Sequence, residues 1–286
     1  MKPTIAPYLF VAPALALYLL LVGLPVIQVV VYSFLSWDSG SVSGFAGFGN
    51  YGKLVADATF WVALSHNAMW VVLTLVFPLG VGLLLAAILA DARPNVRRTF
   101  GAVFFLPRTI PLVVAGIIWG WIYNPIFGLL NWILKEVGLH HLAGAWLASP
   151  RSALLSLNVV GAWTFFGFCV VIYLSAMQAI DPALHEAAAV DGAKWWQRFR
   201  LVTVPMLKGT TLFLGLYAAI EAMRFFDLVW VTTNGGPGYS TEVLSTQIYK
   251  SFFLIGDFGY ASALSVVLLV IVLSVGTLAF WRLRER

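Results

Sequence analysis

Residues 152–205 read SALLSLNVVGAWTFFGFCVVIYLSAMQAI and then DPALHEAAAVDGAKWWQRFRLVTVP. The first part, Ser152 to Ile180, has 29 residues without a charged side chain, enough for a helix that crosses the ~30 Å hydrocarbon core of a membrane. The second part is polar yet rich in helix-forming residues, and it leads into a further apolar run that begins at Gly209. The stretch therefore predicts two transmembrane helices joined by an ordered loop, residues 181–207.

Apolar runs of similar length occur along the rest of the chain. The run near residues 99–123 is interrupted by Arg108, which lies between Pro107 and Pro111, and these prolines are expected to kink that helix. We expect an all-α polytopic membrane protein with one transmembrane domain over residues 1–286. Its six transmembrane helices are predicted at about residues 8–34, 64–90, 99–123, 152–180, 209–231 and 258–281.

The composition excludes a soluble protein. Hydrophobic residues make up 61% and charged residues 10% of the chain, whereas soluble domains have roughly 45–50% and roughly 25%. The single cysteine, Cys169, lies inside an apolar run, so neither a disulfide framework nor a metal cluster is expected. His140 and His141 raise the possibility of a membrane enzyme. Neighbouring side chains on a helix point about 100° apart, however, which disfavours a shared metal ion.

Lysine and arginine are distributed unevenly between the two sides of the predicted membrane. An even number of spans places both termini on one side, and that side holds eleven basic residues: Lys2, Arg93, Arg97, Arg98, Lys194, Arg198, Arg200, Lys208, Arg282, Arg284 and Arg286. The other side holds four: Lys53, Lys135, Arg151 and Lys250. Because short loops rich in Lys and Arg face the cytoplasm, both termini are expected to be cytoplasmic. The net charge of +5 thus reflects topology, and no nucleic-acid partner is expected.

The cytoplasmic loop 181–207 has the features of a helix–turn–helix. Asp181 is expected to cap the first helix, with Pro182 at the first helical position. Gly192 is expected to end that helix in a left-handed conformation. Trp195 and Trp196 then begin a second short helix. Such an element suits docking into a groove of another protein, and it also suits an amphipathic elbow on the lipid surface.

The spacing within this loop resembles the EAA loop, the signature of permease subunits of ABC importers that work with a periplasmic binding protein. The residues that carry the resemblance are Glu186, Ala187, Ala188, Asp191, Gly192 and Pro205. Phe226-Asp227, the Thr233-Asn-Gly-Gly-Pro237 stretch and the segment Trp119 to Asn131 look like the carbohydrate branch of these importers. The whole chain is similar to permeases of the maltose and glycerol-3-phosphate type.

The resemblance implies a fold, a location and a set of partners. The fold is that of a type I ABC importer permease in the bacterial plasma (inner) membrane, with alternating access driven by ATP. The chain has no Gly-x-x-x-x-Gly-Lys-Ser/Thr loop, so it is expected to be a non-catalytic transport subunit that binds no cofactor, with ATP-Mg on partner ATPase subunits. The implied partners are a second homologous permease in a heterodimer, two ATPase subunits and a periplasmic or lipoprotein solute-binding protein. The EAA residues are expected to couple the permease to the ATPase, with Glu186 pairing a basic residue there. A channel or structural subunit would lack this loop.

Two helical stripes point to a solute pathway. Ionisable residues inside a span are costly and usually face the protein interior or a water-filled path. Polar residues in the fifth span and aromatic residues in the fourth recur at helical spacing, at positions that match those lining the sugar site of maltose-type permeases. The residues expected to line the pathway are Gly161, Phe165, Phe168, Tyr217, Glu221 and Arg224.

Other roles remain open for these residues. Glu221 and Arg224 are three apart and could form a structural pair within one helix. The two phenylalanines could serve helix packing, and Asp227 is expected to anchor the Gly-Gly-Pro loop. Arg108 could line the pathway or reach a lipid headgroup, and a structural role is the favoured interpretation. The expected solute is a sugar or related polyol; the alternative is glycerol-3-phosphate or another non-sugar solute.

Overall fold

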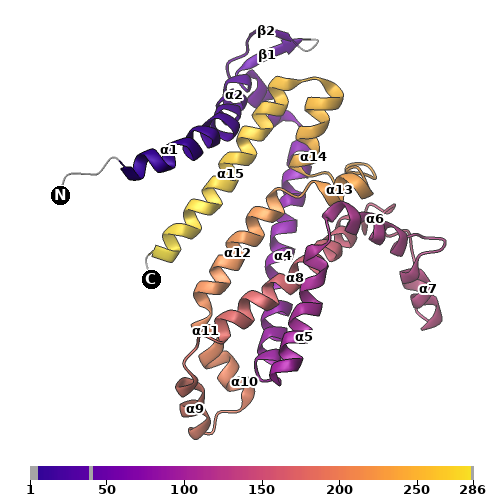
Figure 1. Ribbon diagram of the computed structural model, residues 1–286. Coiled ribbons are helices and arrows are strands. Elements are labelled where there is room, and N and C mark those ends of the chain that lie inside the picture. The colour runs from indigo at the N-terminus through magenta and orange to yellow at the C-terminus, as the bar shows by residue number, and fades with distance from the viewer. Residues whose placement is uncertain (1–5, 39–40, 285–286) are drawn as a thin grey trace. The chain divides into compact units, whose positions relative to one another are not determined.

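The computed structural model describes residues 6–38 and 41–284 (Figure 1). Lys2 and Arg286, which contribute to the predicted orientation, lie outside the described residues. Contacts divide the chain into two compact units, Met1–Trp61 with Gln247–Ile271 and Val62–Thr246 with Val272–Arg286. We describe each unit by itself, as unit 1 and unit 2.

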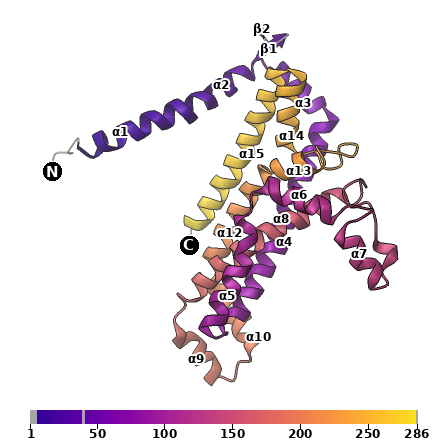
Figure 2. The same ribbon diagram turned by 45° about the vertical axis from the view of Figure 1, so that its right-hand side comes forward.

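Unit 1 begins with a continuous apolar helix, built from α1 (Ala6–Tyr18), a π-helical turn η1 (Leu19–Gly23) and α2 (Leu24–Tyr32) (Figure 2). An antiparallel hairpin follows, β1 (Leu35–Asp38) and β2 (Ser41–Phe45), with a register shift between Ser36 and Trp37. The sequence predicted an all-α protein with an outer loop here, so the hairpin is a correction to that prediction. Its strands are short and rich in serine, and they lack the apolar alternation that identifies a strand.

The rest of unit 1 is helical and held by polar contacts. It comprises α3 (Gly49–Ala56), the π-helix η5 (Lys250–Ile255) and most of α15 (Phe258–Arg284). The side chain of Asn50 donates hydrogen bonds to the carbonyl oxygens of Ser33 and Leu35, both at 2.9 Å. Lys53 forms an ion pair with Asp257 at 3.6 Å. These bonds tie α3 to the start of the hairpin and to the turn before α15.

Unit 2 is built from helices that run past one another, with the short helices of the loop 181–207 at one end (Figure 1). Its elements are α4 (Ala58–Ala90), α5 (Pro94–Phe105), η2 (Leu106–Thr109), α6 (Leu112–Ile122), α7 (Leu129–Glu136), η3 (His140–Leu142), α8 (Ala153–Met177), α9 (Pro182–Val190), α10 (Trp195–Arg198), η4 (Phe199–Thr203), α11 (Val204–Met206), α12 (Lys208–Met223), α13 (Asp227–Thr232) and α14 (Leu244–Tyr249).

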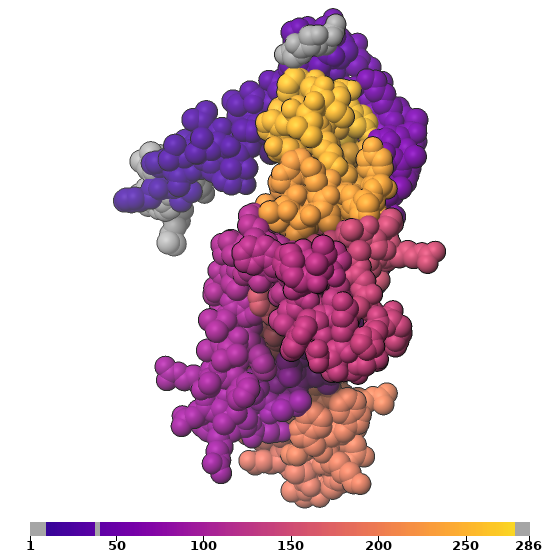
Figure 3. Space-filling model, turned by 90° about the vertical axis from the view of Figure 1, so that its right-hand side faces the viewer, coloured from indigo at the N-terminus to yellow at the C-terminus, as the bar shows by residue number. Residues whose placement is uncertain are grey.

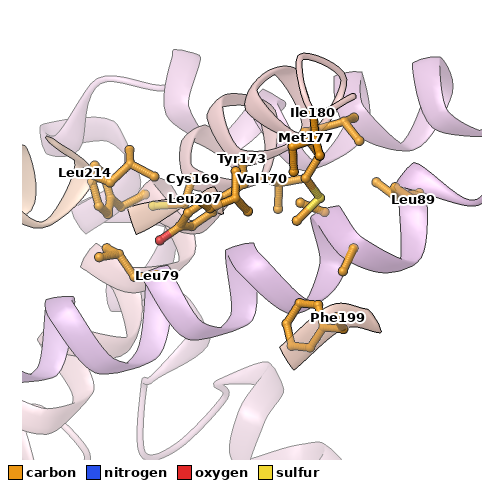
Figure 4. Packing of buried hydrophobic residues seen from close by; sticks show 14 of the residues in the cluster. Leu79, Leu89, Cys169, Val170, Tyr173, Met177, Ile180, Phe199, Leu207 and Leu214 are labelled. Atoms are coloured by element: carbon orange, nitrogen blue, oxygen red, sulfur yellow. The ribbon is translucent and has the colours of Figure 1, made fainter. Parts of the chain in front are cut away.

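The core of unit 2 lies between α4, α8 and α12. Figure 4 shows Leu79 of α4, Cys169 and Tyr173 of α8 and Leu214 of α12 packed together, and all four are buried. A side chain at Gly82 would overlap Cys169, so the glycine lets α4 lie directly against α8. This packing fixes α8 and α12, which carry most of the residues expected to line the pathway.

Four helical segments in the described residues are long and apolar enough to cross a membrane: Phe10–Tyr32, Ala58–Ala90, Ala153–Met177 and Phe258–Thr277. Two bent helix pairs, Pro94–Thr109 with Leu112–Ile122 and Trp195–Met206 with Lys208–Met223, raise the number to six if each pair is one span. The described residues thus contain four to six candidate spans, close to the predicted ones, except that the second bent pair also includes residues 195–206 of the predicted loop.

The third predicted span is broken rather than gently kinked. Its two parts, which end at Thr109 and begin at Leu112, are bent by 95°. Pro107 lies in η2 and Pro111 at the N-cap of α6. Proline lacks the N–H that an uninterrupted helix requires, which explains why the break falls here.

The predicted span 209–231 is also divided, into α12 and α13. The carbonyl oxygens of Ala222 and Met223 at the end of α12 accept hydrogen bonds from the buried side chain of Asn67, at 3.2 and 3.3 Å. The carbonyl of Phe225 accepts one from Ser245 at 2.7 Å. Helix ends leave carbonyl groups without helical partners, and these side chains satisfy them in an apolar environment.

Candidate functional site

Four side chains of unit 2 gather around Arg108, which lies in the η2 turn between the two halves of the broken helix. The Arg108 guanidinium donates a hydrogen bond of 2.8 Å to the Tyr217 hydroxyl and lies 3.9 Å from the Glu221 carboxylate. The guanidinium carbon of Arg108, Cζ, is 5.6 Å from the ring centres of Phe165 and Phe168 and 5.9 Å from the ring centre of Tyr217. We call these five residues the Arg108 cluster.

The rings of the cluster form a continuous aromatic surface. Phe165 and Tyr217 are stacked, 6.0 Å apart with planes 12° apart, and Phe168 lies 5.7 Å from Phe165 and 5.4 Å from Tyr217. Phe165 and Phe168 are three residues apart on α8, and Tyr217 and Glu221 are four apart on α12, so helical spacing presents each pair on one face.

The cluster is partly open. The side chains of Arg108 and Glu221 are 26% and 38% exposed, and Phe168 and Tyr217 are half-buried. An aromatic surface beside a guanidinium and a carboxylate offers both apolar contact and several hydrogen-bonding groups. Ligand sites commonly combine these two properties, with apolar walls and a few placed polar groups. The arrangement suits a solute with an apolar face and hydroxyl groups.

The structure brings together four of the six residues expected to line the pathway. Gly161 lies outside the cluster, where an added Cβ would be 3.2 Å from Phe225 and 3.5 Å from Trp70. These two rings stack with centres 4.2 Å apart, so Gly161 provides space for their packing. Arg224 is exposed and follows the last residue of α12.

The expected structural pair of Glu221 and Arg224 is replaced by a different one. The ion pair of Glu221 is with Arg108, and among the described residues Arg224 takes part in no ion pair. Because α12 ends at Met223, Arg224 no longer follows the helical spacing that would align it with Glu221.

Arg108 was not among the residues expected to line the pathway. A pathway position was one alternative for it and a structural role was favoured, and the structure places it at the centre of the cluster. The sequence feature that could have indicated this position is an arginine between two prolines in an apolar run. A proline-broken span turns side chains at its break towards new neighbours, and intramembrane ionisable residues commonly mark pathways.

The loop 181–207 has the predicted caps. The Asp181 carboxylate accepts a hydrogen bond of 3.0 Å from the Ala183 N–H at the start of α9. Gly192 has φ of +77°, which confirms its predicted left-handed conformation. Its N–H donates to the Ala189 carbonyl at 3.0 Å, and the next N–H, of Ala193, donates to the Ala188 carbonyl at 2.9 Å. This pair of bonds is the Schellman motif, which ends a helix with a fixed turn.

The second half of the loop is held by aromatic stacking and by side-chain hydrogen bonds. Trp195 stacks on Phe199 with centres 5.5 Å apart and planes 2° apart, and Trp196 packs against both. The Trp195 indole N–H donates to the Asp91 carboxylate at 2.7 Å, just after the end of α4. The loop is thereby tied to the long helix α4.

The residues of the EAA-like pattern lie on the outside of this loop. Figure 3 shows the loop as a lobe at one end of unit 2. Glu186, Ala187, Asp191 and Gly192 are exposed and Ala188 is half-exposed. Pro205 is exposed in α11, immediately before the 67° bend into α12. The loop thus has a fixed turn, an exposed face of small residues and a connection to α4. These features suit an element that transmits movement from a bound partner to the helices.

A charged cavity of about 390 Å³ lies beside the loop. Its lining includes Asp91, Arg97, His185, Glu186 and Arg198, so both signs of charge are present. Among the described residues, no group of three or more His, Cys, Asp or Glu side chains could hold a metal ion. The polar groups of this region are thus arranged for contact with polar or charged surfaces.

Comparisons with known proteins agree on one family. Residues 79–284 match the family described as binding-protein-dependent transport system inner membrane component, a range that includes the Arg108 cluster and the loop. The chain is 39% identical to the probable ABC transporter permease protein YurN of Bacillus subtilis over 274 residues, which cover 94% of this chain and 93% of that protein. It is 33% identical to the lactose transport system permease protein LacF of Rhizobium radiobacter, over 98% of this chain and 94% of that protein.

A solved structure shares the fold. A chain of a bacterial ABC transporter involved in the import of the acidic polysaccharide alginate superposes with a TM-score of 0.85. The match covers 98% of this chain and 95% of that chain at 24% sequence identity. The arrangement of helices is therefore that of a permease of an ABC importer.

Proposed function

The chain belongs to the family of binding-protein-dependent transport system inner membrane components, and on this premise we propose that it carries a sugar or related polyol across the membrane. It is a multi-pass inner-membrane permease subunit of an ABC importer, a transport subunit that works with ATPase and binding-protein partners. The observation that carries the choice of solute is the Arg108 cluster, an aromatic surface beside an ion pair in the middle of the broken span.

The cluster supports a neutral, hydroxyl-rich solute. Arg108 and Glu221 compensate each other's charge, so the site as a whole has no excess charge for a charged solute to neutralise. Both groups keep hydrogen-bonding capacity for hydroxyls, because a guanidinium has five N–H donors and a carboxylate about four acceptor sites. The rings of Phe165, Phe168 and Tyr217 would contact the apolar face of a sugar ring.

The loop supports coupling to an ATPase. In this proposal the residues that contact or support that contact are Glu186, Ala187, Ala188, Asp191, Gly192 and Pro205. The exposed first helix α9 would dock in the ATPase, and the Schellman turn would keep it from bending. Movement of α9 would pass through the Trp195–Asp91 hydrogen bond to α4, and rigid-body motion of the helices would alternate access to the cluster.

We further propose the composition of the transporter. The chain would form a heterodimer with a second homologous permease, bound to two ATPase subunits that hold ATP-Mg, and a binding protein would deliver the solute. The proposed spans are the four long helices, the bent pair Pro94–Thr109 with Leu112–Ile122, and the part of the second bent pair that begins at Lys208, which gives six spans with both termini cytoplasmic. The Lys and Arg distribution supports this orientation.

A second candidate solute is glycerol-3-phosphate or another anionic non-sugar compound. The Arg108 guanidinium is 26% exposed and its ion pair with Glu221 is long, 3.9 Å, so a phosphate could take the place of the carboxylate. Guanidinium groups match the geometry of phosphate oxygens.

The solute class is tested with the purified complex in lipid vesicles. ATPase activity is measured against a panel of solutes loaded on the binding protein: neutral disaccharides, sugar alcohols and glycerol-3-phosphate. We expect stimulation by at least one neutral sugar or sugar alcohol. Stimulation by the phosphate ester alone would replace the proposed solute class by the second candidate.

A further inference from the structure

A groove of about 590 Å³ runs along the surface of unit 2 between α5 and α8, which lie side by side in Figures 1 and 2. We call it the α5–α8 groove. Its floor includes Gly101 and Ala102, and Phe105 and Val171 line it further along the two helices. It is separate from the Arg108 cluster and shares no lining residue with it.

Two glycines explain why a groove forms here. At Gly167 of α8 an added Cβ would overlap the Phe104 carbonyl, so the two helices are in direct contact at that level. At Gly101, less than one turn earlier on α5, an added Cβ meets no atom within 4 Å. The helices therefore touch at one level and leave open space beside Gly101.

The groove changes from polar to apolar along its length. Arg97 and Arg98 from the start of α5 lie at the same end as Ser175 and Gln178 from the end of α8. The positions towards Phe105 are apolar. The groove thus has cations and hydrogen-bonding groups at one end and apolar groups at the other. A phospholipid has the matching order, with a phosphate and ester groups followed by hydrocarbon chains.

Neither arginine at this end forms a close ion pair with a described carboxylate, although Arg97 also lines the charged cavity beside the loop. The ion pairs among the described residues are Lys53–Asp257 and Arg108–Glu221, and neither involves Arg97 or Arg98. Both arginines lie near the N-terminal end of α5, which has no acidic residue in its first turn. Positive charge near a helix N-terminus is unfavourable because of the helix dipole, so an anion would be stabilised here.

We propose that the α5–α8 groove binds one anionic phospholipid. Its phosphate lies between Arg97 and Arg98, its ester groups lie near Ser175 and Gln178, and one acyl chain covers Gly101. Basic pockets at the membrane surface between transmembrane helices bind lipids of this class, and α5 begins four residues after the last residue of the long span α4. The inference does not depend on which solute the protein carries.

The lipid would also lie next to a functional element. Phe105, at the far end of the groove, is the last residue of α5, and η2 with Arg108 follows directly. A lipid against this helix would restrict movement of the η2 turn, so the lipid composition would influence transport.

The test measures lipid retention by the intact transporter complex. The complex is transferred to bilayer discs of phosphatidylcholine with increasing phosphatidylglycerol, and retained lipids are counted by native mass spectrometry. We expect selective retention of phosphatidylglycerol. Arg97→Gln and Arg98→Gln should each weaken it about fivefold, the effect of one basic residue near a charged membrane surface. Gly101→Leu should abolish it, because the leucine side chain would fill the open space.

Two variants serve as controls. Gly120→Leu adds the same side chain at another open glycine, on α6, and Arg200→Gln removes an exposed arginine from the cytoplasmic loop. Both should retain phosphatidylglycerol as the unchanged protein does. Equal retention by the Gly101→Leu, Arg97→Gln and unchanged complexes would overturn the proposal. A second result would also overturn it: the Gly101→Leu complex loses the second permease subunit but binds lipid as before. The groove would then be an interface between subunits.

Discussion

Replacing Gly192 by valine is expected to abolish coupled uptake while the ATPase subunits remain able to hydrolyse ATP. Gly192 has φ of +77°, a conformation that is strained for a β-branched residue. The expected conformational cost is about 1–3 kcal/mol, enough to disfavour the turn by about fivefold to more than a hundredfold. An added Cβ at Gly192 meets no atom within 4 Å, so the effect comes from the backbone and not from a steric overlap.

The matched control is Gly192→Asn. Asparagine tolerates the left-handed conformation far better than valine, so this variant should keep most of the coupled uptake. The measurement compares solute uptake and ATP hydrolysis in reconstituted vesicles for both variants. Wild-type uptake by the Gly192→Val complex would show that the Schellman turn is not needed for coupling.

The second large effect is expected for Arg108→Ala. The change removes the hydrogen bond to Tyr217 and leaves the Glu221 carboxylate without its ion pair. Hydrogen bonds that involve a charged group contribute about 1.5–3 kcal/mol, so we expect uptake to fall at least about tenfold. The measurement is the initial uptake rate at several solute concentrations.

Two further variants separate a solute role from a structural one. Arg108→Lys keeps the charge but loses the planar guanidinium, so it should assemble normally and transport at an intermediate rate. Arg151→Ala, which removes an exposed arginine just before α8, should behave as wild type. If both Arg108 variants fail to assemble with the partner subunits, the residue is structural. Normal uptake by Arg108→Ala would place the pathway elsewhere.

Local sequence rules were enough to predict the helix ends in the loop 181–207. Asp181 before a proline identified the start of α9, and Gly192 after a run of alanines identified its end, because helix caps depend on a few adjacent residues. Helical spacing likewise placed Phe165 with Phe168 and Tyr217 with Glu221, since each pair lies on one uninterrupted helix.

Two of the features that sequence reasoning missed depend on contacts between distant segments. α12 ends at Met223 because Asn67 of α4 satisfies its last carbonyl groups, and this removed Arg224 from the predicted stripe. Arg108 reaches Tyr217, 109 residues away, because the helix that carries it breaks and turns. The hairpin at residues 35–45 has no apolar alternation, so nothing in its own sequence distinguished it from a loop.

The most direct test of the proposed transport pathway is to measure whether the Arg108 cluster can be reached from each side of the membrane. Cys169 is the only cysteine and is buried, so a Cys169→Ala, Phe168→Cys protein carries one thiol, at the half-exposed edge of the cluster. The reconstituted complex is labelled with a membrane-impermeant thiol reagent from each side, with and without ATP and the loaded binding protein. We expect labelling from the cytoplasmic side without ATP and from the opposite side when ATP and the binding protein are present. Labelling that ATP does not change, or no labelling from either side, would contradict the claim that the cluster lines an ATP-driven pathway.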